Sequence, residues 1–185
     1  MKLDPYFRKN NHYKMTFAMS YNEYENYILV LSHDEVVHLK CSMLMKMPGF
    51  MPDKFANLRA GYAFMFGHCG KKLLFMGQDF AQEREWSEAR ELDWYCLEDP
   101  YHAGMKLFVS DFLKLYRKYR SLWEFDNSYE GFRWINADDT EKSLYSFIRT
   151  NSTGKDNLVF VVNFTPMKRD DYRVGVPQAG KYTLP

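Results

Sequence analysis

Residues 27–38 read YILVLSHDEVVH, a short apolar run followed directly by a polar group. The run over 27–31 is hydrophobic at every position, which is typical of a strand buried in a parallel sheet. His33 and Asp34 would then lie at the carboxyl end of that strand. Because reactive side chains gather at this end in parallel α/β architectures, the segment predicts an α/β fold with a candidate site at His33 and Asp34.

A helix and a second apolar strand are expected downstream. Asp53 is a good helix N-cap, and Phe55, Leu58 and Tyr62 follow helical spacing until the pattern stops near Gly67. Residues 73–76 form another short apolar run, which predicts the second strand. Strand, helix and strand make a βαβ unit, so the first part of the chain is expected to be α/β. Residues 14–21, upstream, are expected to be helical.

The remainder of the chain changes character. A long loop over 78–100 carries Trp86 and Trp94, and a helix is expected over 103–119. From residue 129 the pattern favours strands, at 131–136, 143–149 and 157–164, with shorter ones at 172–176 and 181–184. The sequence therefore predicts an α/β domain over 1–125 and an antiparallel β domain over 126–185. The chain stops on a strand-like segment, which indicates truncation.

Composition narrows the classes of partner. The net charge is +1 and basic residues alternate with acidic ones, so nucleic acid is not an expected partner. No run of about 18 apolar residues is present, so no membrane partner is expected either. Cys41, Cys69 and Cys96 lack paired spacing, which favours reduced thiols and a cytoplasmic location. The 18% aromatic content suits sugar stacking, although a dense aromatic core is the more common explanation.

The polar group at 32–38 has two other interpretations. His33 and His38 are five residues apart and do not form the HExxH spacing of a zinc helix, so no metal is expected. On its own, a His-Asp pair after a strand is most simply structural, with the aspartate capping the next turn. A resemblance to a known family favours a functional interpretation instead.

Several motifs resemble branching enzymes of the α-amylase superfamily, in the order in which that family has them. Besides residues 31–38, they are MPG at 47–49, KFANLR at 54–59, GKKLLFMG at 70–77, FAQ at 80–82, EW at 85–86, LDW at 92–94 and NFTP at 163–166. The motifs cover nearly the whole chain. The resemblance implies the C-terminal portion of a TIM (β/α)8 barrel over 1–125, followed by an incomplete all-β sandwich domain over 126–185. Residues 27–31 and 73–76 would be its seventh and eighth strands.

The resemblance also implies an activity and site roles. These enzymes cleave an α-1,4 glucan chain and transfer it to a 6-hydroxyl, which makes an α-1,6 branch in glycogen biosynthesis. Asp34 matches the carboxylate that stabilises the transition state, and His33 matches a substrate-binding histidine. Trp86 is expected to contact substrate, with the alternative that it only pins the long loop to the barrel. Glu35 and His38 are expected to support the site. The implied partner is an α-1,4-glucan such as glycogen, with no cofactor.

The nucleophile and the general acid of the family are expected upstream, in the remainder of the same polypeptide. The chain is therefore interpreted as a C-terminal fragment that is inactive alone. Leu39 and Cys41 depart from the family pattern, which often has glycine and a small or basic residue there. Two alternatives stay open: an α-glucan hydrolase or trehalose-forming relative of the same superfamily, and a non-catalytic glucan-binding fragment.

Overall fold

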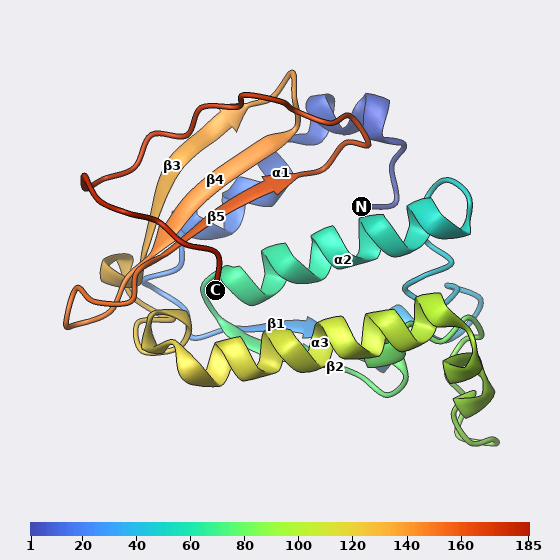
Figure 1. Cartoon of the computed structure of the whole chain (residues 1–185). Coiled ribbons are helices and arrows are strands. Elements are labelled where there is room, and N and C mark those ends of the chain that lie inside the picture. The colour runs from blue at the N-terminus through green and yellow to red at the C-terminus, as the bar shows by residue number, and fades with distance from the viewer.

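The computed structural model describes residues 1–185 and contains two sheets connected through a long helix (Figure 1). The helices are α1 (Tyr13–Thr16), α2 (Met51–Gly67) and α3 (Pro100–Lys118), and several short 3-10 turns lie between them. The strands are β1 (Ile28–Leu31), β2 (Lys71–Leu74), β3 (Phe132–Asp139), β4 (Leu144–Arg149) and β5 (Leu158–Asn163). β1 and β2 pair in parallel, and β3, β4 and β5 form an antiparallel sheet in that order.

The strand, helix and strand predicted from the sequence are present. β1 pairs with β2 from Ile28 opposite Lys71 to Leu31 opposite Leu74. The second strand begins and ends two residues earlier than predicted. Lys71 and Lys72 pair with Ile28 and Leu29, and the turn that contains Gly77 starts at Phe75, whose carbonyl accepts from the Gln78 amide. Gly77 has a φ of +79°, a backbone conformation that glycine adopts without strain.

The prediction that the first strand is buried on every side is wrong. Ile28 is 55% exposed and Val30 is 51% exposed, whereas Leu31 packs against the core. The physical reason is that β1 has one neighbouring strand and is covered by α2 on one face only. The other face of the two-stranded sheet, which also includes the 37% exposed Leu73, meets solvent.

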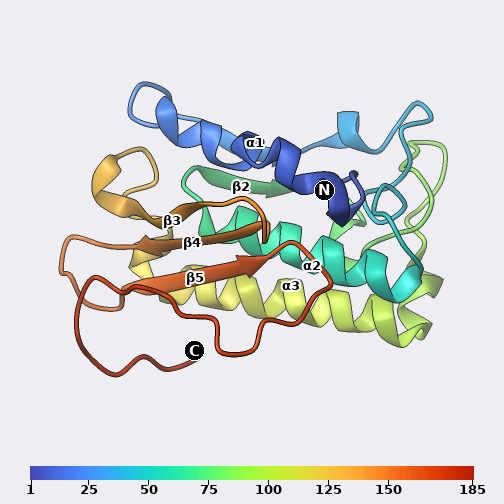
Figure 2. The same ribbon diagram turned by 90° about the horizontal axis from the view of Figure 1, so that it is seen from above.

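α2 lies at the centre of the molecule, between the antiparallel sheet and the parallel pair (Figures 1 and 2). Phe55, Leu58 and Phe66 pack toward β1, β2 and α3, while Phe64 packs toward the antiparallel sheet. A helix that is apolar on two sides must be covered on two sides. α2 thereby joins the hydrophobic cores of both sheets.

An aspartate forms a hydrogen bond at the N-terminus of each long helix. The prediction that Asp53 is the N-cap of α2 is wrong. Asp53 lies inside the first turn, where its Oδ2 accepts a hydrogen bond from the Phe50 amide at 3.1 Å. Asp99 caps α3 by accepting from the Tyr101 amide at 2.7 Å, with Pro100 as the first helical residue. α3 therefore begins three residues before the predicted start. The predicted helix over 14–21 is divided into α1 and a 3-10 turn at Phe17–Ser20.

The antiparallel region has the three predicted strands, but the two strands expected in the C-terminal tail do not form. Residues 172–176 and 181–184 have no ladder partner, and the tail runs past the sheet as an irregular segment (Figure 1). Tyr172 is fixed by a single side-chain bond to Asp139, at 2.9 Å. Instead of a sandwich of two sheets, one sheet packs against α2 through Phe147 and Phe160, among others.

Candidate active site

His33 and Asp34 lie where β1 ends, beside the end of β2. The turn that carries them is a short 3-10 helix, His33–Glu35, begun by Ser32, whose hydroxyl accepts from the Asp34 amide at 3.2 Å. His33 Nε2 lies 3.4 Å from Asp34 Oδ1. Their side chains are 57% and 70% exposed, so both are open to a ligand. The carboxylate can accept hydrogen bonds from sugar hydroxyls, and the imidazole beside it can donate hydrogen bonds to them.

The two residues predicted to support the site differ in their surroundings. Glu35 lies against Lys46, whose ammonium is 3.6 Å from Glu35 Oε2 and also bonds the Glu35 carbonyl. Burial lowers the pKa of Lys46, whose side chain is 4% exposed. His38 is exposed and makes no side-chain hydrogen bond. Buried Val36 and Val37 lie between Glu35 and His38 and anchor the segment to the core.

Trp86 lies near the candidate site, separated from His33 by the ring of Phe75. Its indole meets Phe75 edge-on at 5.1 Å, and Phe75 meets the His33 ring at 6.0 Å. The Trp86 amide also donates to the Val36 carbonyl at 3.0 Å. The structure therefore brings His33, Asp34 and Trp86 to one end of the parallel pair. Trp94 packs elsewhere, stacked on Phe80 at 5.2 Å.

The long loop that carries Trp86 is fixed by a buried carboxylate. Asp93 is 1% exposed, and it accepts from Arg84 Nε at 2.7 Å while its amide donates to Gln82 Oε1 at 2.9 Å. The hydrogen bond from Arg84 holds the pKa of the Asp93 carboxyl below its usual value. The FAQ and LDW motifs thus share a structural task, which is to close this loop.

Asp34 is the carboxylate best placed to meet a ligand. Glu35 is engaged by Lys46, Glu85 by the backbone amides of Leu39 and Cys41, and Asp93 by Arg84. A retaining glycosidase needs a nucleophile and an acid about 5–5.5 Å apart, both free to react. These engaged carboxylates do not supply such a pair. The arrangement can therefore bind a sugar and stabilise positive charge.

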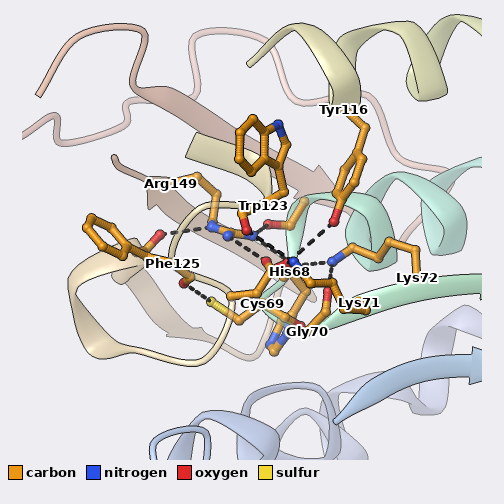
Figure 3. Close-up of polar contacts among 12 residues, drawn as sticks. His68, Cys69, Gly70, Lys71, Lys72, Tyr116, Trp123, Phe125 and Arg149 are labelled. Atoms are coloured by element: carbon orange, nitrogen blue, oxygen red, sulfur yellow. Dashed lines mark hydrogen bonds and ion pairs between the residues drawn. The ribbon is translucent and has the colours of Figure 1, made fainter. Parts of the chain in front are cut away.

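Sequence reasoning missed a second polar cluster, centred on Arg149 of β4 (Figure 3). The Arg149 side chain is fully buried and donates to the Gly67 and His68 carbonyls at 2.9 Å each and to Gly131 at 2.8 Å. Its remaining nitrogen lies 3.0 Å from Asp126 Oδ1. A cation that binds the last carbonyls of α2 complements the negative end of the helix dipole. The available sequence signal was that Arg149 ends a predicted strand in which most residues are apolar.

Asp126 connects this cluster to β2 and α3. Its second oxygen accepts from Lys71 at 2.9 Å and lies 3.3 Å from the Tyr116 hydroxyl. Lys72 donates to the His68 carbonyl at 2.7 Å, and burial lowers its pKa to about 7. Burial likewise lowers the pKa of the His68 imidazole to about 4. Figure 3 shows Lys71, Lys72, Tyr116 and His68 converging with Arg149 between the parallel pair and the antiparallel sheet.

Comparison with known proteins gives consistent matches. Residues 134–184 match the family described as "Alpha amylase, C-terminal all-beta domain". The chain is 67% identical over 183 residues to the 1,4-alpha-glucan branching enzyme GlgB of Butyrivibrio fibrisolvens. It is 50% identical to the proteins of the same name from Roseobacter denitrificans, over 182 residues, and Aquifex aeolicus, over 177 residues. These matches cover 96–99% of this chain.

The relatives are much longer than this chain. It spans 29% of the Butyrivibrio protein, 25% of the Roseobacter protein and 28% of the Aquifex protein. The resemblance to branching enzymes predicted from the motifs is confirmed, and so is the all-β domain expected near the C-terminus. None of the helices is both long and apolar enough to cross a lipid bilayer.

Proposed function

We propose that this chain is part of a 1,4-α-glucan branching enzyme, to which it contributes the carboxylate that stabilises the transition state. The observation that carries the proposal is the exposed pair of Asp34 and His33 at the carboxyl end of a parallel strand. The identity of 67% to a branching enzyme over nearly the whole chain gives that pair its context.

The chemistry assigned to Asp34 follows from its accessibility and charge. In a retaining transfer the sugar ring flattens and becomes positively charged as the glycosidic bond breaks. A fixed carboxylate that bonds the sugar hydroxyls strengthens those bonds as the charge develops. His33 would orient the same sugar, and Trp86 would offer an apolar ring face at the rim. Glu35 would support the turn through its ion pair with Lys46, and the supporting role of His38 stays a prediction.

We further propose that β1, α2 and β2 belong to the closing part of a TIM barrel. Support comes from the parallel register and from the exposed apolar side chains of Ile28, Val30 and Leu73. Strands of a parallel barrel are covered on both faces, so such residues are expected to pack against further strands and helices. The relatives contain enough additional chain to supply them.

The nucleophile and the general acid would then come from the remainder of the longer polypeptide. This assignment predicts that the 185-residue chain alone does not form branches on amylose. Activity in the isolated chain, measured as new α-1,6 linkages above a blank, would contradict the assignment. In the full-length polypeptide the same assay should give branches, whereas shortened linear chains alone would indicate a hydrolase instead.

The decisive variant is Asp34→Asn in the full-length polypeptide. The amide keeps the shape but removes the charge, so kcat should fall by about 100-fold or more. Because the side chain is 70% exposed, the melting temperature should hardly change. Asp111→Asn on α3 is a matched control, since its side chain is 55% exposed and pairs only with Lys114. Full branching by Asp34→Asn would refute the assigned role.

A second candidate, a glucan-binding module without catalysis, is favoured because the carboxylates Glu35, Glu85 and Asp93 are all engaged by other groups. It predicts saturable binding of maltoheptaose to the isolated chain. Calorimetric titration should show this binding weakened by His33→Ala and by Asp34→Ala, and unchanged by Asp111→Asn. Binding that is equal in all the variants would place the sugar away from the candidate site.

A further inference from the structure

The turn that follows the candidate site has an unusual backbone. His38, Leu39 and Cys41 have φ values of +56°, +64° and +66°, in the left-handed region that favours glycine. None of the three is glycine, and each side chain in this conformation carries a steric cost. Leu39 is 95% exposed, so no hydrophobic packing of its own compensates. The turn therefore requires support from outside itself.

That support comes from the carboxylate of Glu85. Oε2 accepts from the Leu39 amide at 3.0 Å, and Oε1 accepts from the Cys41 amide at 2.5 Å. Each oxygen takes one amide, so the arrangement requires two acceptors on one side chain. Glutamine offers a single acceptor, and its amino group would face an N–H donor. Arg90 donates to the Glu85 carbonyl at 2.5 Å and holds the backbone of Glu85 itself.

The supported turn is connected to Asp34 by two short paths. Lys40, within the turn, donates its ammonium to the Asp34 carbonyl at 2.7 Å. Trp86, the neighbour of Glu85, donates its amide to the Val36 carbonyl at 3.0 Å. The segment that bears Asp34 is thus fixed to the turn on one side and to the Glu85 segment on the other.

We propose that Glu85 is a positioning residue for Asp34. By binding both amides of the left-handed turn, it keeps that turn closed and thereby fixes the carboxylate that faces substrate. Glu85 itself contacts no substrate in this scheme. The proposal deepens the assignment of Asp34 and, in its consequence for activity, rests on the proposed branching function.

The first test measures how readily the turn opens and does not depend on enzymatic activity. Trypsin cuts after lysine, so cleavage at Lys40 in the 185-residue chain reports local opening of the turn. Glu85→Gln should raise the rate of this cleavage about tenfold, because one of the two hydrogen bonds is lost and the other is no longer charge-assisted. Glu88→Gln is the matched control, since Glu88 lies in the same loop, is exposed and makes no side-chain bond. Equal cleavage of Glu85→Gln and the parent chain would overturn the proposal.

The second test uses the full-length polypeptide and a rescue. Glu85→Gln should lower kcat for branching about tenfold with little change in KM. Leu39→Gly removes one of the three steric costs in the left-handed turn and, in the Glu85→Gln background, should restore part of the lost rate. A substrate-contacting glutamate would not be rescued by a glycine in another segment. Failure of Leu39→Gly to restore the rate would therefore overturn the positioning role.

The two tests separate the two proposals. If the parent polypeptide forms no branches while Glu85→Gln still accelerates cleavage at Lys40, the branching function is refuted and the closed turn stands. If the parent forms branches and Glu85→Gln changes neither cleavage nor kcat, the positioning role is refuted and the branching function stands.

Discussion

Among individual residues, Arg149 is the most completely buried charged side chain. Its guanidinium has no exposed surface and depends on Asp126, which is itself almost completely buried. Replacing Arg149 with methionine removes the donors to the end of α2 and leaves the Asp126 charge without its buried partner. Breaking a buried ion pair in this way costs about 3–5 kcal/mol. Urea unfolding of Arg149→Met should show a loss of this size.

Lys71 provides the control for that prediction, because it binds the other oxygen of the same aspartate. Its side chain is 54% exposed, and exposed ion pairs contribute only about 0–1 kcal/mol. Lys71→Met should therefore lower the free energy of unfolding much less than Arg149→Met. Equal losses in the two variants would mean that Asp126, rather than the buried arginine, sets the stability of the cluster.

Lys72 predicts how stability depends on pH. Burial is the main cause that lowers its pKa to about 7, opposed by Asp126 and assisted by Arg149 and Lys71. An unfolded lysine stays protonated up to about pH 10.4, so between these values the unfolded state binds more protons. Raising the pH from 7 to 8.5 should therefore stabilise the fold, by at most about 1.4 kcal/mol per pH unit.

The measurement is urea unfolding at several pH values within that window. Lys72→Met should flatten most of the upward slope, whereas Lys71→Met should keep it. The remainder comes from the Met1 amino group, whose pKa burial also lowers. The window stops at pH 8.5 because burial also raises the pKa of the Cys69 thiol, whose effect on stability has the opposite sign. If the parent chain and Lys72→Met have the same slope, Lys72 is not the titrating group.

At the scale of elements, two helical glycines predict opposite outcomes. A Cβ on Gly67, the last residue of α2, would lie 2.6 Å from Phe160 of β5. Gly67→Ala should therefore destabilise the contact between α2 and the antiparallel sheet by about 1–3 kcal/mol. A Cβ on Gly104 in α3 would meet nothing within 4 Å, so Gly104→Ala should stabilise the fold by about 0.5–1 kcal/mol. Thermal unfolding of both variants would show whether the signs differ.

The elements also show what sequence patterns can predict. Hydrophobic periodicity located α2, α3 and β3 to β5, because each buries a face against a neighbour within this chain. The same reasoning failed for β1. A continuous apolar run such as residues 27–31 indicates burial but does not indicate which element covers the strand. It also failed at 172–176, where Tyr172, Val174 and Val176 alternate as in a strand but find no ladder partner.

The candidate site was predictable to a similar degree. The position of His33 and Asp34 at a strand end follows from the sequence, because a polar pair directly after an apolar run must lie there. The support from Glu85 was not predictable, since it joins residues 44 and 46 positions apart through backbone amides. Long-range contacts of this kind depend on how the 78–100 loop folds back, and the loop has no periodicity from which to infer it.

At the scale of the whole molecule, the two sheets are not independent units. The face of α2 that carries Phe55 and Phe66 belongs to one core, and Phe64 belongs to the other. Arg149 adds polar bonds from β4 to the end of the same helix. The predicted boundary at residue 125 therefore separates two chain segments that share a helix in space, and we expect them to unfold in one cooperative transition.

The exposed face of the parallel pair predicts how the isolated chain behaves in solution. Ile28, Val30 and Leu73 form an apolar surface on a sheet with unpaired edges, and such surfaces promote association between copies. Analytical ultracentrifugation of the 185-residue chain should show species larger than its 22.1 kDa monomer. Val30→Lys should shift the distribution toward monomer by placing a charge on this face.

Leu107→Lys is the matched control, because Leu107 is similarly exposed, at 60%, but lies on α3 away from the sheet. A monomeric parent chain, or an equal effect of both lysines, would show that this face does not drive association and would weaken the argument that further barrel strands cover it.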